Sequence, residues 1–130
     1  MDFTEQIGIE TQLMEDGVCE LSLEVADPHL SLAARVHGGV LFSLLDSALG
    51  RAILSQLPAG RGCATVEIKI NYFRPVQSGR LLARAEVVNL GRRVGYAEGQ
   101  ITNGEGKLVA RATGTFFLTE TLKQSERERV

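Results

Sequence analysis

One segment of this sequence has helical periodicity, and the segments around it alternate in the manner of strands. Between residues 38 and 55, apolar side chains recur every three or four positions, which predicts a helix with little polar surface. The periodic positions are Val40, Leu41, Leu44, Leu45, Ala48, Leu49, Ala52 and Ile53. We expect the helix to end before Pro58, Gly60 and Gly62. A single helix this apolar has to be covered by the rest of the chain, and that requirement restricts the possible folds.

Six segments alternate apolar and polar residues, and the helix separates the first two from the last four. The predicted strands are residues 7–14, 18–26, 64–73, 80–90, 93–102 and 107–118. Asp16-Gly17 and Asn103-Gly104 are pairs typical of hairpin turns. Residues 28–36, between the second strand and the helix, are expected to form a loop.

The faces of the predicted strands indicate how the helix is covered. In residues 64–73, the alternation places Val66 and Ile68 on one face and Thr65 on the opposite face. In the last three strands, small residues dominate one face, which lets another element approach closely. These residues are Ala83, Ala85, Gly95, Ala97, Gly99, Ala110, Ala112 and Gly114. We therefore predict an α+β fold in which a curved antiparallel sheet wraps around one long central helix.

The length and composition fit a single domain. The chain has 130 residues, and its hydrophobic content of 44% can fill a core without disulfides or a structural metal. We expect this domain to cover residues 1–118. The mostly polar residues 119–130 are expected to form a charged C-terminal tail.

Charge and cysteine content argue against several classes of protein. A net charge of -2 disfavours nucleic acid or an anionic membrane as the main partner. Cys19 and Cys63 are isolated, which favours a reducing compartment, and no His/Cys cluster suggests a zinc site. The N-terminus does not resemble a signal peptide, and no apolar run has transmembrane length. We therefore expect a cytoplasmic protein without a metal site.

The start of the predicted helix carries the residues most suited to chemistry. His37 is followed by Gly38 and Gly39, which leave backbone N–H groups approachable by an oxyanion or a polarised carbonyl. Asp46 lies inside the apolar helix, where a carboxylate is costly unless it is paired, hydrogen-bonded or used. Together these residues indicate a site for carbonyl chemistry. Asp46 is also compatible with a structural role at the helix edge, His37 with a helix cap, and the glycines with close packing.

The spacing of His37 and Asp46 has a geometric consequence. On one regular helix, nine steps rotate the two side chains by about 180° and separate them by roughly 13 Å. They could not then share one small site within a single chain. If both residues act together, His37 and its glycines must meet Asp46 from a second copy, and a two-fold dimer would form two such sites.

These residues resemble those of the hotdog-fold acyl-CoA thioesterases, specifically the phenylacetyl-CoA thioesterase-like (PaaI-like) group. The resemblance runs from about residue 7 to residue 118 and is strongest in HGGVLFSLLDSALG at residues 37–50. Supporting segments are ATVEIKINYFRPVQSG at 64–79, LGRRVGYAEGQI at 90–101 and GKLVARATGTF at 106–116. The resemblance implies a hotdog fold, dimers that often pair into tetramers, and hydrolysis of an acyl-CoA thioester at the dimer interface. It implies no cofactor, because CoA is part of the substrate.

The resemblance also implies roles for individual residues. Asp46 falls at the position of the catalytic carboxylate, which acts as a nucleophile or as a general base on water. Gly38 falls where a backbone N–H polarises the thioester carbonyl, and His37 matches the histidine of the motif. Thr65 falls where a hydroxyl helps to place the attacking water or the carboxylate, although an ordinary strand residue would fit there as well.

One departure from the family pattern affects the loop before the helix. The family usually has Asn-x-x-Gly-x-x-His-Gly-Gly, whereas this sequence has Ser31 and Ala34 at the Asn and Gly positions. Ser31 offers a shorter hydroxyl in place of an amide, which bears on turnover and substrate choice more than on the fold. The candidate substrate-binding residues are Ser31, Gly39, Phe42, Arg92 and Arg93. The two arginines are compatible with CoA phosphates and equally with a solvated surface.

Two other functions fit the same residues. The first is a hotdog hydratase or dehydratase acting on an acyl thioester, whose acidic residue and histidine are usually placed differently. The second is a non-catalytic acyl-CoA binding protein, which the Ser31 departure favours. The acyl group is not defined, because Phe42, Ile53, Tyr72 and Phe73 could line an apolar pocket or belong to the core.

Overall fold

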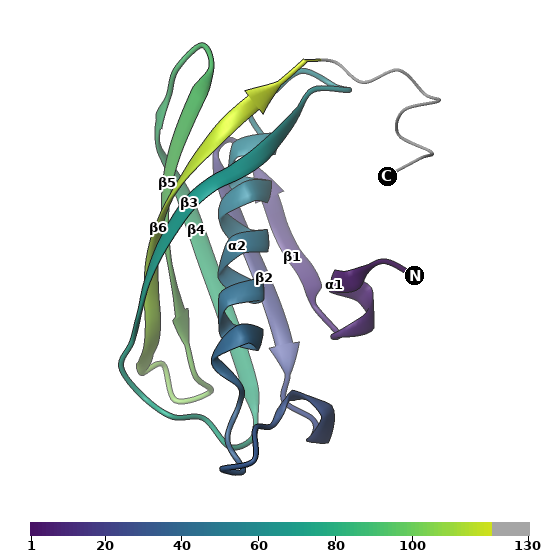
Figure 1. Cartoon of the computed structure of the whole chain (residues 1–130), viewed down its shortest axis with the longest axis vertical. Helices are drawn as coiled ribbons and strands as arrows, with labels where there is room; N and C mark the ends of the chain where they lie inside the picture. The colour runs from purple at the N-terminus through teal and green to yellow at the C-terminus, as the bar shows by residue number, and fades with distance from the viewer. Residues whose placement is uncertain (121–130) are drawn as a thin grey trace.

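A computed structural model describes residues 1–120 and shows a six-stranded antiparallel sheet curved around one long helix (Figure 1). The elements are α1 (Phe3–Gln6), β1 (Glu10–Glu15), β2 (Val18–Glu24), the 3-10 turn η1 (Asp27–His29), α2 (Gly38–Leu54), β3 (Gly62–Tyr72), β4 (Arg80–Leu90), β5 (Val94–Thr102) and β6 (Leu108–Thr119). The strand order is β1-β2-β4-β5-β6-β3, so β1 and β3 form the two edges. The predicted α+β architecture is confirmed.

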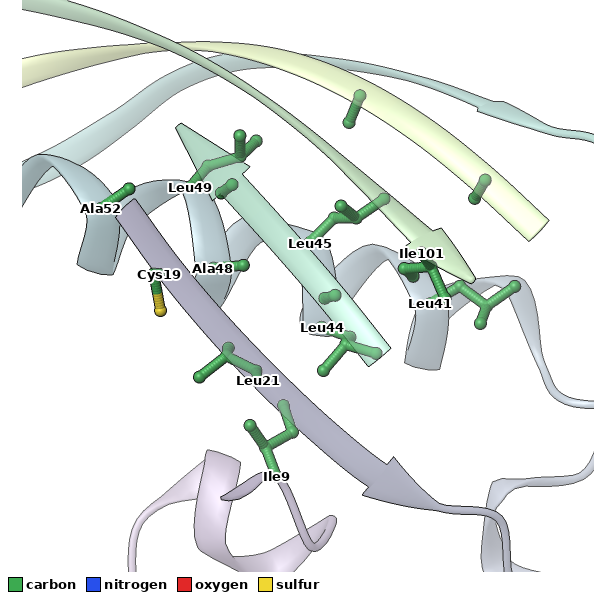
Figure 2. Packing of buried hydrophobic residues seen from close by; sticks show 14 of the residues in the cluster. Ile9, Cys19, Leu21, Leu41, Leu44, Leu45, Ala48, Leu49, Ala52 and Ile101 are labelled. Atoms are coloured by element: carbon green, nitrogen blue, oxygen red, sulfur yellow. The ribbon is translucent and has the colours of Figure 1, made fainter. Parts of the chain in front are cut away.

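Helix α2 forms one side of the core and the inner face of the sheet forms the other. Figure 2 shows the buried side chains of α2 packed against β2 and β5. The buried residues of α2 are Leu41, Leu44, Leu45, Ala48, Leu49, Ala52 and Ile53. Burying this apolar surface supplies most of the driving force for the fold. Although α2 is apolar, no helix within residues 1–120 is long and apolar enough to cross a membrane.

Glycines on β5 and β6 set how closely the helix approaches the sheet. A Cβ atom at Gly95 would lie 3.0 Å from Ile53 Cδ1. A Cβ atom at Gly114 would lie 3.2 Å from Leu49 Cδ1, 3.2 Å from Ile68 Cγ1 and 3.0 Å from Phe116 Cε1. The predicted close approach of the helix to a face of small residues is therefore confirmed, because larger side chains would push α2 outward.

A bulge in β3 corrects the face predicted for Thr65. Thr65 pairs with the buried Phe116, and Glu67 pairs with the neighbouring Thr115, so Val66 is the extra residue between them. Thr65 consequently shares the inner face with Ile68, whereas simple alternation placed it opposite. Val66, predicted on the face of Ile68, is 64% exposed. A single inserted position reverses the faces of the strand on one side of the bulge.

The chain termini and turns differ in detail from the sequence prediction. The first strand begins at Glu10 rather than at residue 7, because Ile7 is the C-cap of the short helix α1 and Gly8 has a positive φ. The N-cap of α1, Asp2, accepts a hydrogen bond from Glu5 N–H. The turn at Asp16 and Gly17 has positive φ at both residues, as expected for the predicted hairpin. The second hairpin uses a longer turn, residues 103–107. Of the predicted tail, residues 121–130 lie outside the described residues.

We expect Gly114→Ala to lower the free energy of unfolding by about 1–3 kcal/mol, the usual cost of overpacking. Its Cβ would meet three side chains at the closest part of the helix–sheet interface. The matched control is Gly104→Ala in an exposed turn, where the nearest atom to a new Cβ is 4.0 Å away. The control should change stability by less than about 0.5 kcal/mol in urea unfolding. Equal effects of the two substitutions would contradict the packing argument.

Candidate active site

Two side chains on the inner face of β3 bind α2 at separate places. Thr65 Oγ1 donates a hydrogen bond to Asp46 Oδ1 at 2.7 Å. Tyr72 donates its hydroxyl to the carbonyl oxygen of Gly38 at 2.9 Å. Partial burial raises the pKa of the Tyr72 phenol, so the hydroxyl keeps its proton and remains a donor. The strand therefore links the carboxylate in the middle of α2 to the glycine at its first turn.

His37 is the N-cap of α2, and its ring uses one of the two glycine N–H groups. Gly39 N–H donates to His37 Nδ1 at 2.8 Å. Gly39 also allows this ring position, because a Cβ there would lie 2.9 Å from Nδ1. Within residues 1–120, the N–H of Gly38 has no hydrogen-bond partner. Gly38 is thus the residue that presents a free donor at the positive end of the helix.

A buried histidine that the sequence placed in a loop anchors this turn. His29 accepts a hydrogen bond from Ala26 N–H at its Nδ1 (2.9 Å), and its Nε2 lies 2.6 Å from the carbonyl oxygen of Ile7. Its own carbonyl accepts from His37 N–H at 2.9 Å. The Ala26 contact is local, but the contact with Ile7 spans 22 residues, so the sequence pattern did not indicate this anchoring role.

Asp46 lies half-buried beside a thiol that stays protonated. Burial raises the pKa of Cys63 to about 11, and the nearby negative charge of Asp46 adds to the shift. A neutral thiol is a poor nucleophile, so Asp46 remains the candidate for the reactive group on this side of the helix. Within the described part of the chain, no three His, Cys, Asp or Glu side chains gather as metal ligands would.

The free N–H and the carboxylate are too far apart to act on one carbonyl within a single chain. Gly38 and Asp46 lie on the same regular helix, and eight residues correspond to a rise of about 12 Å. A reacting carbonyl must lie about 3 Å from both its oxyanion donor and its attacking group. Within one copy of the chain, these two groups therefore cannot form a single site.

The remaining candidate residues are spread over the structure. Phe42 is half-buried one helical turn before Asp46. Arg92 and Arg93 are exposed in the β4–β5 turn, at the same end of the molecule as the C-terminal end of α2 (Figure 1). Within one chain, these arginines are therefore not brought to the Gly38 end of the helix.

Ser31 is engaged within its own loop. Its Oγ accepts a hydrogen bond from Ala33 N–H at 3.2 Å, and its backbone N–H donates to Arg35 at 2.7 Å. Ala34 has a φ of 58°, in the left-handed region that favours glycine. This conformation gives a physical reason for the glycine that the family pattern has at the Ala34 position.

A cavity of about 350 Å³ borders Gly38. Its lining residues are Arg35, Val36, Gly38, Leu41, Tyr72, Phe73, Arg74 and Pro75. A larger hollow of about 680 Å³ lies between α1, β2 and η1 and does not reach Gly38 or Asp46. The smaller cavity is the one beside the free N–H, so it is the candidate substrate pocket.

Comparison with known proteins identifies the family. Residues 34–110 match the family model described as the thioesterase superfamily. The chain belongs to the thioesterase superfamily. The fold described above is the hotdog fold of this family, as the resemblance implied.

Three members of the family illustrate the similarity. The chain is 33% identical over 105 residues to a relative from Archaeoglobus fulgidus, covering 80% of this chain but only 66% of that protein. It is 32% identical over 105 residues to the acyl-coenzyme A thioesterase PaaI of Escherichia coli, covering 80% of this chain and 73% of that protein. A hypothetical thioesterase from Streptococcus pneumoniae, solved with coenzyme A, superposes with a TM-score of 0.81 at 31% identity, covering 89% of each chain.

The negative charge of Asp46 near Cys63 predicts the reactivity of the thiol. A pKa of about 11 leaves about 100-fold less thiolate at pH 8 than the ordinary value of 9.0 does. Asp46→Asn removes a negative charge that raises this pKa, so the pKa should fall and the rate of alkylation at pH 8 should rise. The rate would be measured in a Cys19→Ala background, which leaves Cys63 as the single thiol.

Glu67→Gln is the control for this measurement, because Glu67 is exposed and lies on the outer face of the same strand. It should leave the alkylation rate unchanged. An Asp46→Asn rate no higher than that of the control would show that the carboxylate does not act on the thiol.

Proposed function

We propose that this chain hydrolyses an acyl-CoA thioester to a free acid and CoA, at a site built from two copies. The proposal rests on two groups that side chains of β3 hold in place. One is the Asp46 carboxylate, which accepts a hydrogen bond from Thr65. The other is the free N–H of Gly38, whose carbonyl accepts a hydrogen bond from Tyr72. The thioesterase description of the Escherichia coli relative and the coenzyme A in the Streptococcus structure support this substrate class. The reaction needs no cofactor.

The free edge of β3 is the surface through which we propose that two copies pair. β3 ends the sheet, has 11 residues, and is exposed along most of its length. A long exposed edge strand offers unpaired backbone groups to a second strand. An antiparallel pairing centred on Lys69, with Val66 as the extra residue in each copy, would set Thr65 of each copy opposite Tyr72 of the other.

This register joins the two halves of the site. Thr65 holds Asp46, and Tyr72 holds Gly38, both on the inner face. Residues directly opposite in an antiparallel pair point to the same face of the sheet. The partner's Gly38 would therefore lie beside Asp46, and the two-fold axis would create a second identical site. We further propose that such dimers pair into tetramers, as the family resemblance implies.

The chemistry follows from this arrangement. The thioester carbonyl accepts a hydrogen bond from Gly38 N–H, which stabilises the negative charge that develops on oxygen by about 2.7–4 kcal/mol. Asp46 of the other copy attacks the carbonyl carbon directly or takes the proton of an attacking water. Thr65 occupies one carboxylate oxygen and leaves the other available. The C–S bond then breaks, and CoA leaves as the thiol with the proton that the attacking water gives up. After direct attack by Asp46, water hydrolyses the acyl–Asp46 anhydride, which frees the acid, restores the carboxylate and supplies the proton for the CoA sulfur.

The other candidate residues take supporting roles in this proposal. His37 and Gly39 hold the first turn so that the Gly38 N–H points outward. Phe42 contributes apolar surface beside Asp46, and Ser31 shapes the loop before the helix. Arg92 and Arg93 remain candidates for CoA phosphates, which they would reach on the partner's site or at the rim.

A non-catalytic acyl-CoA binding protein is the second candidate. The observation that favours it is the hydrogen bond that the Ser31 hydroxyl accepts within its own turn. With this hydroxyl occupied, no side chain at position 31 replaces the asparagine amide of the family pattern in the site. If the wild-type protein binds acyl-CoA but does not hydrolyse it, this second function is the correct one.

The first test is release of free thiol from aryl, short-chain and medium-chain acyl-CoA by the wild type and Asp46→Asn. Loss of the base or nucleophile should lower kcat by at least about 100-fold, while CoA binding measured by calorimetry persists. Thr65→Val should give a smaller loss, because it only frees a carboxylate oxygen. Glu67→Gln again serves as the control. Unchanged turnover in Asp46→Asn would exclude Asp46 as the catalytic carboxylate.

The second test removes the oxyanion donor without disturbing the helix. Gly38 is the first helical residue, where proline is tolerated, and His37 has φ -62° and ψ 136°, which suits a residue before proline. Gly38→Pro should therefore lower kcat by about 100- to 1,000-fold with little loss of stability. Gly38→Ala is the control, since it keeps the N–H and its Cβ would make an ordinary 3.4 Å contact with Tyr72.

Mixing the two inactive variants tests whether the site spans two copies. In a mixed dimer of Asp46→Asn and Gly38→Pro, one site carries both changes and the other carries neither. Random pairing should restore about a quarter of the wild-type activity. No recovery, with co-purification of differently tagged copies showing that mixed dimers have formed, would place both groups of each site in one chain and refute the proposed arrangement.

A further inference from the structure

Two arginines flank the cavity beside Gly38. Arg35 lies in the loop before α2, and Arg74 follows the end of β3. A hydrogen bond from Val36 N–H to the carbonyl of Val76, at 2.8 Å, fixes these two segments side by side. The arginines therefore border one cavity although they are far apart in the sequence.

Neither guanidinium group stabilises the fold through a polar contact within the described residues. Within residues 1–120, Arg35 and Arg74 have no carboxylate within 4.0 Å, and neither side chain donates a hydrogen bond. Other arginines do have such partners. Those that donate to oxygen atoms of the chain are Arg51, Arg61, Arg84 and Arg111.

The charge around this cavity is all of one sign. Its lining includes two arginines and the first residue of α2 but no Asp or Glu. The helix start adds partial positive charge. The other walls are mainly apolar, provided by Val36, Leu41, Phe73 and Pro75. Both arginines are exposed, so their guanidinium groups are accessible to an anionic oxygen, which they bind through charge-assisted hydrogen bonds.

We propose that Arg35 and Arg74 form an anion-binding subsite for the thioester substrate. The inference rests on the proposed function, because the substrate carbonyl is taken to lie at the Gly38 N–H that borders the same cavity. The ligand is an anionic oxygen group of the substrate. Either a carboxylate at the far end of the acyl group or a phosphate of CoA has this chemistry.

A two-by-two set of substrates distinguishes the two sources of negative charge. The acyl group is either a short dicarboxylic half-acid or a neutral acyl group of the same length. The carrier is either CoA or N-acetylcysteamine, which lacks phosphates. The enzyme is the wild type or Arg35→Gln/Arg74→Gln, and Arg111→Gln is the control for loss of surface charge on the outer face.

The double variant should lose about tenfold or more in kcat/KM for the anionic substrates that use the subsite. A loss that follows the acyl carboxylate on either carrier assigns the subsite to the acyl group. A loss that follows CoA with either acyl group assigns it to a phosphate. Equal kcat/KM for the double variant and the control on all four substrates would overturn the proposal.

A binding measurement separates this proposal from the proposed hydrolysis. Calorimetry with CoA, pantetheine and the free dicarboxylic acid needs no turnover. If the wild type hydrolyses nothing but binds CoA or the diacid at least about tenfold more tightly than the double variant does, the hydrolysis is refuted and the subsite is retained. If the wild type and the double variant bind every ligand equally, or the wild type binds neither CoA nor the diacid, the subsite is refuted.

Discussion

Burial of an apolar helix against a sheet that has small residues at the contact is the constraint on which the rest of this structure depends. α2 can be covered only if the sheet curves around it, and Gly95 and Gly114 let the two surfaces meet closely. This contact fixes the helix in position, and so fixes Gly38 and Asp46 at its start and middle. A site that relies on backbone N–H groups and a half-buried carboxylate needs a rigid support of this kind.

Strand β3 combines three properties that are usually separate. It closes the core through Ile68 and Ile70, it holds Asp46 and Gly38 through polar side chains, and it leaves one edge unpaired. Pairing along that edge would complete both the sheet and the site. In this proposal, assembly and catalysis use the same strand, so a change that weakens pairing would also separate the reacting groups.

Much of the fold could be predicted because its pattern is local. Helical spacing defined α2, alternation defined the strands, and Asp16-Gly17 defined a hairpin. The cap by His37 and the place of Asp46 on the helix were also accessible from the motif. The contact of His29 with the carbonyl of Ile7 was not, because it joins segments distant in sequence. The face of Thr65 was predicted wrongly, since a bulge depends on the pairing of two strands rather than on one.

The bulge at Val66 also changes which positions of β3 can be altered. An alignment based on alternation would mark Val66 as a core residue to be preserved and Thr65 as a surface residue suitable for labels or charges. The structure differs at both positions, since Val66 is 64% exposed and Thr65, although also exposed, lies on the inner face and is bonded to Asp46. Val66 is thus a position from which a probe could report on the free edge, whereas a probe at Thr65 would displace the partner of the carboxylate.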